Sequence, residues 1–159
     1  MEKVDYIKAL RIPLILIIFQ IILTYVLSWF TFKNATSYEQ IIAAEASITI
    51  YSRLIMIFSY AIVYYTGWIV VSKFKGNIKN SIFAGLIIGC IEIVLSFINI
   101  ILMYNTIPGY KIGLSPIFGL GELGIIAFVG ILIGLLFTLA INAGVAALGG
   151  FISLKVNKK

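Results

Sequence analysis

One acidic residue, Glu92, lies in the middle of an apolar stretch that is long enough to cross a bilayer. An acidic side chain at the centre of a membrane helix costs about 2.5 to 3.5 kcal/mol. Hydrocarbon favours the neutral form of a carboxyl group unless a cation or hydrogen-bond donors are near. No Lys or Arg lies at a matching depth in any apolar stretch. Glu92 therefore predicts either a proton or cation site on a transport path or a structural hydrogen bond between helices.

Several uncharged polar residues could bind the Glu92 carboxyl group. The candidates are Gln20, Asn99, Asn142 and Tyr64, each within an apolar stretch. Depth along the chain does not choose among them. We interpret Glu92, Asn99, Asn142 and Gln20 as the intramembrane polar set.

Other reactive chemistry is scarce. The chain has no His and a single Cys, Cys90, which lies in an apolar run. This composition excludes His-ligated zinc, His-ligated haem, a Ser–His dyad and paired-cysteine redox chemistry. No phosphate-binding glycine loop is present. We predict that the protein is not an enzyme, and we expect no cofactor and no metal site.

The composition places these residues in a membrane. Of 159 residues, 62% are hydrophobic and 11% are charged, and the mean hydropathy is +1.12. Soluble domains carry roughly 25% charged residues. We therefore predict an all-α, multi-pass protein of the cell membrane, forming one domain over residues 1–159 and packed as a compact bundle of four transmembrane helices.

Four apolar stretches match the length that a spanning helix needs, about 20 residues. The predicted spans are residues 12–32, 41–72, 81–104 and 122–154, with outer loops at 33–53 and 105–121 and an inner loop at 73–80. Residues 38–52 overlap the second span, and they extend it to about 35 residues if they are helical, or ~52 Å at 1.5 Å per residue. Whether 38–52 and 105–121 are helical, interfacial or re-entrant stays open.

The basic residues predict the orientation. They are Lys3, Lys8 and Arg11 near the N-terminus, Lys73, Lys75 and Lys79 between the second and third spans, and Lys155, Lys158 and Lys159 at the C-terminus. Lys and Arg concentrate in cytoplasmic segments, so we expect both termini in the cytoplasm. The net charge of +6 then reflects topology, and no nucleic-acid partner is expected. On the other side, Glu45 and Arg53 point in different directions around a helix and are not expected to pair.

Small and polar residues form a stripe on each span. In the third span they are Gly85, Gly89, Glu92, Ser96 and Asn99, and in the fourth they are Gly130, Gly134, Thr138, Asn142, Ala146 and Gly150. Lipid tails drive no hydrophobic association between helices, so small residues that permit close backbone contact stabilise the bundle. We predict packing through Gly85, Gly89, Gly130, Gly134, Thr138, Ala146 and Gly150.

Two functions fit this sequence. The first is a non-enzymatic subunit or scaffold that packs through its glycine-rich helix faces against another membrane subunit or a second copy of itself. The second is a small proton- or cation-coupled transporter or channel that works as a homo-oligomer around Glu92. A carrier usually needs more than one ionisable residue in its pathway, and this chain supplies one near the middle of a span, Glu92.

Overall fold

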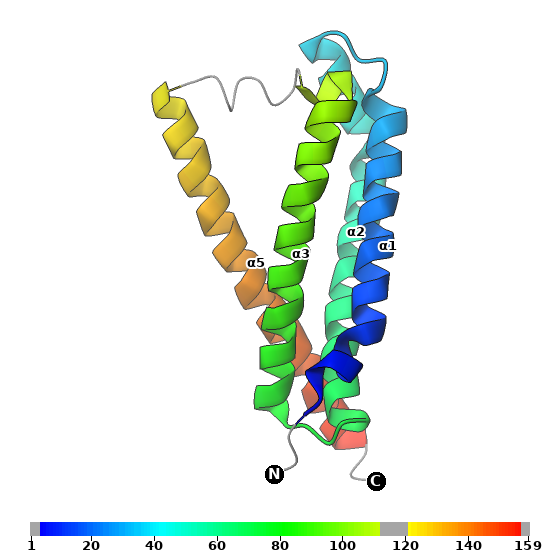
Figure 1. Ribbon diagram of the computed structural model, residues 1–159, viewed down its shortest axis with the longest axis vertical. Helices are drawn as coiled ribbons and strands as arrows, with labels where there is room; N and C mark the ends of the chain where they lie inside the picture. The colour runs from blue at the N-terminus through cyan, green and yellow to red at the C-terminus, as the bar shows by residue number, and fades with distance from the viewer. Residues whose placement is uncertain (1–3, 112–120, 157–159) are drawn as a thin grey trace.

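The computed structural model describes residues 4–111 and 121–156, with side chains in the last helix from residue 129 onward. This part of the chain is helical and contains no strand. The helices are α1 (Tyr6–Phe32), α2 (Tyr38–Ser72), α3 (Ile78–Thr106) and α5 (Gly121–Val156) (Figure 1). All four are long and apolar enough to cross a membrane. The prediction of an all-helical protein with four apolar helices is confirmed.

Helix α2 begins earlier than the predicted outer loop at residues 33–53 allows. It begins at Tyr38 and has 35 residues. The Ser37 side chain caps it by accepting a hydrogen bond from the Gln40 backbone N–H, 3.3 Å away. Ile41, in its first turns, is buried with Phe32 and Met103. The cap and this apolar contact make residues 38–53 helical, which leaves only 33–37 to connect α1 with α2.

A tight connection joins α2 to α3. Lys75 adopts a left-handed backbone conformation with φ of 50°, and the Gly76 N–H donates to the Val70 carbonyl at 3.0 Å. Asn77 and Asn80 then form a reciprocal capping box at the start of α3. These local bonds satisfy backbone groups that a helix end leaves unpaired. They turn the chain back within five residues, so α2 and α3 lie antiparallel.

The four helices are not equally packed along their lengths. Helices α1, α2 and α3 contact one another, and α5 contacts α2 and α3. Within the described residues α5 does not contact α1. In Figure 1, α5 lies close to α3 near the chain termini and diverges from it toward the other end. The expected compact bundle therefore holds for the half of the molecule that contains the termini.

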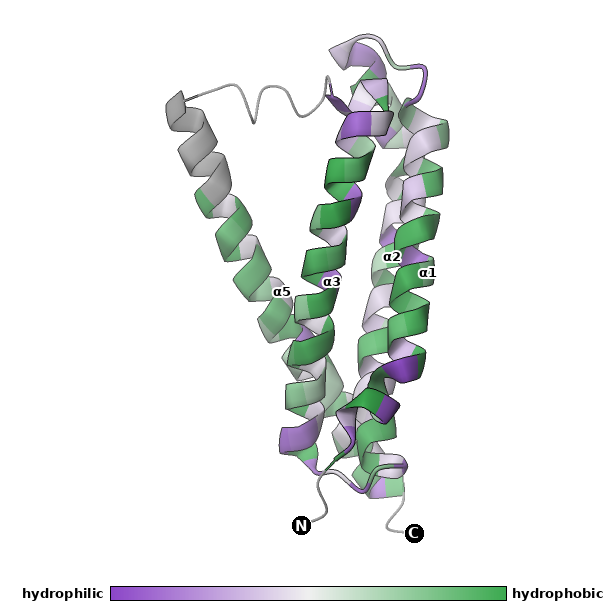
Figure 2. Ribbon diagram, viewed as in Figure 1, coloured by the Kyte–Doolittle hydropathy of each residue, from purple (hydrophilic) through white to green (hydrophobic). Residues whose placement is uncertain are grey.

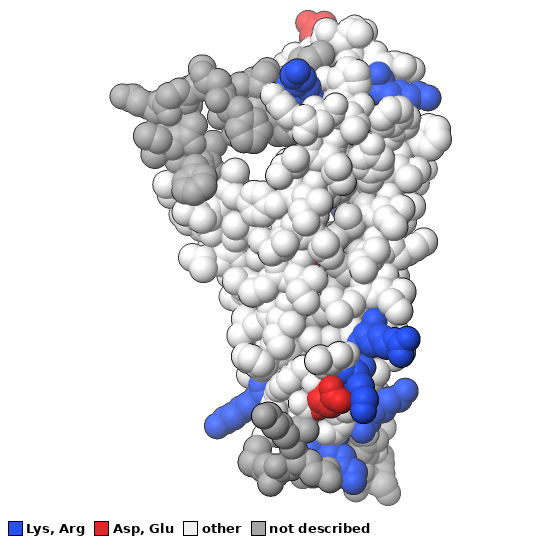
Figure 3. All heavy atoms as spheres, viewed as in Figure 1, with Lys and Arg blue, Asp and Glu red and all other residues white. Residues whose placement is uncertain are grey.

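Charge and hydropathy divide the molecule into zones. The helices are hydrophobic over their middle parts, and hydrophilic residues gather toward both ends (Figure 2). On the face shown in Figure 3, Lys and Arg also gather at the two ends, with a broad belt of uncharged atoms between them. Both termini lie at the same end (Figure 1). An uncharged belt around four apolar helices is the pattern of a membrane protein.

Candidate functional site

The Glu92 carboxyl group lies where α2, α3 and α5 meet. The Ser59 hydroxyl of α2 donates a hydrogen bond to Glu92 Oε1. The Asn142 amide of α5 donates to Glu92 Oε2 at 3.3 Å. No Lys or Arg of the described residues pairs with Glu92. Two neutral donors from two other helices therefore hold both oxygens of this half-buried carboxyl group.

Antiparallel packing places Ser59 at the depth of Glu92. Roughly equal numbers of residues separate Ser59 from the end of α2 and Glu92 from the start of α3. The sequence reveals Ser59 as a small polar residue of the second span but not as a partner of Glu92. Counting equal numbers of residues back along α2 and forward along α3 from the connection between them would have paired Ser59 with Glu92. Ser59 is buried, so its hydroxyl serves as a donor inside the helix junction.

Of the other polar residues predicted to bind Glu92, Asn142 lies at this junction, whereas Asn99, Gln20 and Tyr64 do not bond to Glu92. Asn142 is 1% exposed and joins Glu92. Asn99 is buried two turns farther along α3 and makes no hydrogen bond with Glu92. Gln20 of α1 is 8% exposed, and its Oε1 has no hydrogen-bond partner among the described residues. Tyr64 also makes no hydrogen bond with Glu92.

Glycines of α3 let α5 approach closely at the same level. A Cβ atom added at Gly85 would lie 2.6 Å from the Ala146 Cβ and 2.7 Å from the Asn142 carbonyl oxygen. A Cβ at Gly89 would lie 2.9 Å from the Asn142 amide nitrogen. All three distances are shorter than real Cβ contacts. The absence of side chains at these two positions therefore permits Asn142 to reach Glu92.

Helix α5 also contacts the backbone of α2 and the first turn of α3. A Cβ atom added at Gly67 would collide with the Ala146 carbonyl, and one at Gly149 would collide with the Tyr64 carbonyl. A Cβ at Gly150 would collide with the Ser81 hydroxyl. Gly67 and Gly149 do not belong to the predicted stripes. Gly149 lets α5 contact α2, and the adjacent Gly150 lets it contact α3. A search for small residues spaced four apart does not reveal such an adjacent pair.

The half of α5 farther from the chain termini lacks these contacts. A Cβ added at Gly130 or Gly134 would have no atom within 4 Å, although both were expected to pack within the bundle. The half-buried Thr138 donates its hydroxyl hydrogen to the Gly134 carbonyl of its own helix, at 3.0 Å. Steps of four residues drift around a helix by about 40° each, so positions 130 and 146 face directions about 160° apart. One face of α5 cannot hold the whole row.

The basic residues expected to set the topology are exposed where the structure describes them. These are Arg11, Lys73, Lys75, Lys79 and Lys155. Lys158 and Lys159 lie outside the described residues. The described chain contains no cluster of three or more His, Cys, Asp or Glu side chains that could hold a metal ion.

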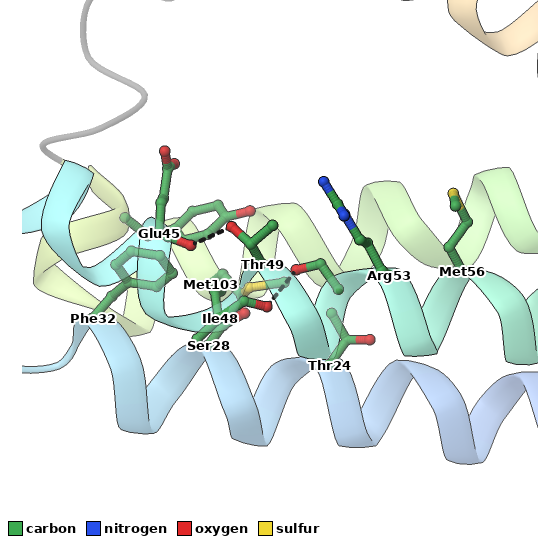
Figure 4. A pocket seen from close by; sticks show the side chains of 11 residues that line it. Thr24, Ser28, Phe32, Glu45, Ile48, Thr49, Arg53, Met56 and Met103 are labelled. Carbon is green, nitrogen blue, oxygen red and sulfur yellow. Dashed lines mark hydrogen bonds between the residues drawn. The ribbon is translucent and has the colours of Figure 1, made fainter.

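A second polar region lies at the opposite end from the termini. There α1, α2, the end of α3 and the segment that follows α3 line an open cavity of about 530 Å³. Its lining residues are Thr24, Ser28, Phe32, Glu45, Ile48, Thr49, Ser52, Arg53, Met56, Met103 and Tyr110 (Figure 4). Burial raises the pKa of the Tyr110 phenol, and the negative charge of Glu45 raises it further. Sequence reasoning noted Glu45 and Arg53 but did not place them in one cavity.

Comparisons with known proteins leave the family open. No protein-family model matches this chain, and neither the curated proteins nor the solved structures contain a match.

Proposed function

We propose that this chain is a non-enzymatic membrane subunit or scaffold that binds another membrane helix along the outer half of α5. The observation that carries the proposal is the surface of residues 129–137. Gly130 and Gly134 have open space beside them, and the large neighbours Leu136 and Phe137 are 68% and 66% exposed. Lipid can cover Leu and Phe, whereas spaced small residues favour close contact with a second helix.

The proposed orientation places both termini in the cytoplasm. The two termini lie at one end of the molecule (Figure 1). The basic connection between α2 and α3 lies at that end as well. Basic segments favour the cytoplasmic side. The diverging half of α5 then lies in the outer part of the cell membrane.

The mass of the particle purified in mild detergent tests the subunit role. We expect a mass that includes a second copy or a larger membrane partner. Gly134→Leu fills the free surface and should release that partner, since a bulky side chain prevents close helix contact. Gly144→Leu is the matched control, because Gly144 also has no neighbour within 4 Å but lies in the inner half. A single chain in detergent and in bilayers, or retention of the partner by Gly134→Leu, would contradict the proposal.

A proton- or cation-coupled transporter, acting as a homo-oligomer, is the second candidate. Its support is one carboxyl group at the junction of three helices with no paired cation in the described chain. Intramembrane carboxyl groups commonly mark ion pathways. Glu92→Gln preserves the shape of the side chain and one acceptor oxygen, but its amide cannot exchange a proton as a carboxyl group does. Proton or cation flux into reconstituted vesicles should then fall to background, and equal flux in Glu92→Gln, or none in the original chain, would remove this candidate.

A further inference from the structure

Two opposite charges line the cavity at the outer end without pairing. Glu45 and Arg53 are both exposed on α2, and Figure 4 shows their side chains on the same side of that helix. Eight residues correspond to about 12 Å along a helix axis. Within the described residues neither side chain forms an ion pair. The cavity therefore presents a separated negative and positive charge.

The hydroxyl groups in the cavity are hydrogen-bond acceptors toward a ligand. Thr49, Ser52 and Thr24 each donate to a carbonyl oxygen one turn earlier in their own helix, at 3.0, 3.2 and 2.9 Å. A hydroxyl group has one hydrogen and two lone pairs. With the hydrogen used, each of these oxygens can only accept another bond. Thr49 lies one turn after Glu45 on α2, so its hydroxyl oxygen and the Glu45 carboxylate together suit an ammonium group.

Arg53 provides the complementary part of the cavity. A guanidinium group carries five donors in a planar fork that matches the oxygens of a phosphate or carboxylate. Met56 and Met103 line the same cavity with apolar surface, which suits the carbon atoms of a ligand. The volume of about 530 Å³ lies within the range of small-molecule sites, about 300 to 1,000 Å³.

We infer that this cavity binds a zwitterion, with a primary ammonium group at Glu45 and a phosphate or carboxylate at Arg53. An aminophospholipid headgroup and a free water-soluble zwitterion share this chemistry. All the lining residues come from one chain, so the inference does not depend on the proposed subunit role.

Lipid and headgroup binding to the purified full chain tests the inference. Native mass spectrometry would compare phosphatidylethanolamine, phosphatidylcholine and phosphatidylglycerol with identical acyl chains, and calorimetry would measure free phosphoethanolamine. We expect phosphatidylethanolamine to bind at least tenfold more tightly than the two other lipids. Choline has no N–H to donate, and the glycerol headgroup has no ammonium.

Variants identify the residues responsible. Arg53→Gln and Glu45→Gln should each lower ethanolamine-lipid affinity at least tenfold. Lys33→Gln and Glu39→Gln are the matched controls, because they remove one positive and one negative charge near the same end of α2 but outside the cavity lining. They should change affinity less than twofold. Unchanged melting temperatures would show that the first two variants remain folded.

The outcomes separate the two sources. Binding of free phosphoethanolamine with the same dependence on Arg53 and Glu45 supports a small zwitterion. Binding only of the acylated form supports a lipid. Equal affinity for the three lipids, or unchanged affinity in Arg53→Gln and Glu45→Gln, overturns the inference.

Discussion

Removal of the Glu92 side chain should leave two polar groups without partners. In Glu92→Ala the Ser59 hydroxyl and the Asn142 amide lose their acceptor, and both residues are buried. We expect a loss of about 1 to 2 kcal/mol in unfolding free energy, since membrane hydrogen bonds are individually modest. Unfolding of the purified protein in detergent with increasing denaturant measures this change.

Glu92→Gln is the control for that experiment, because its amide can donate to Ser59 while its carbonyl accepts from Asn142. Its loss should be less than about 1 kcal/mol. Equal losses in the two variants would show that the hydrogen bonds at this junction contribute little.

The first turn of α1 should respond to pH through Asp5. The pKa of this carboxyl group lies below its ordinary value of 3.8, because the Lys8 backbone N–H donates to it and the Lys8 ammonium adds a smaller effect. A lowered pKa means that the ionised cap stabilises the helix fully above pH 3.8. That stabilisation is lost as pH falls through the lowered pKa.

The Lys8 amide proton reports this titration by NMR. Its chemical shift should change with a midpoint below pH 3.8, and Asp5→Asn should abolish the change while leaving an oxygen to accept the bond. A midpoint at or above 3.8 would contradict the capping interaction.

Close backbone contacts, rather than large side chains, hold the half of α5 nearer the chain termini against α2 and α3. The clearest pair for a test is Gly149 and Gly144, both on α5. A Cβ at Gly149 meets backbone atoms of Tyr64 and Trp68, whereas one at Gly144 meets nothing within 4 Å. Gly149→Ala should destabilise the protein by about 1 to 3 kcal/mol, since backbone cannot move aside cheaply. Gly144→Ala should stabilise it by up to about 1 kcal/mol through helix propensity.

Thermal unfolding of both variants in the same detergent measures the difference. A Gly149→Ala melting temperature at or above that of Gly144→Ala would show that α5 does not press on α2 at this point.

The positions of the helices can be predicted from the sequence, whereas the way in which they pack cannot. Apolar length and the Asn77–Asn80 cap are local properties, so the four helices could be predicted. The direction in which each glycine of α5 faces is not local, because it depends on where two other helices lie. Gly85 and Gly150 have neighbours and Gly134 does not, although all three look alike in the sequence. Ser59 was similarly visible, but its pairing with Glu92 needed the relative depth of two helices.

The orientation of the whole chain can be tested by labelling intact cells. In a background with Cys90→Ser, single cysteines at Lys33 and Lys75 report opposite ends of α2. A membrane-impermeant maleimide should label Lys33→Cys in intact cells and Lys75→Cys only after permeabilisation, because the basic connection favours the cytoplasm. The reverse pattern would invert the proposed topology.

The missing contact between α1 and α5 has a consequence for biosynthesis. Helices α1, α2 and α3 already contact one another in every pairing, and all three leave the ribosome before α5. Synthesis proceeds from the N-terminus, so N-terminal segments can make contacts before the C-terminal ones exist. We therefore expect a nascent three-helix intermediate in which Ser59 already donates to Glu92, while Gly67, Gly85 and Gly89 leave backbone exposed at the surface on which α5 packs. In that order of assembly, the hydrogen bond from Asn142 to Glu92 forms last, when α5 packs against α2 and α3.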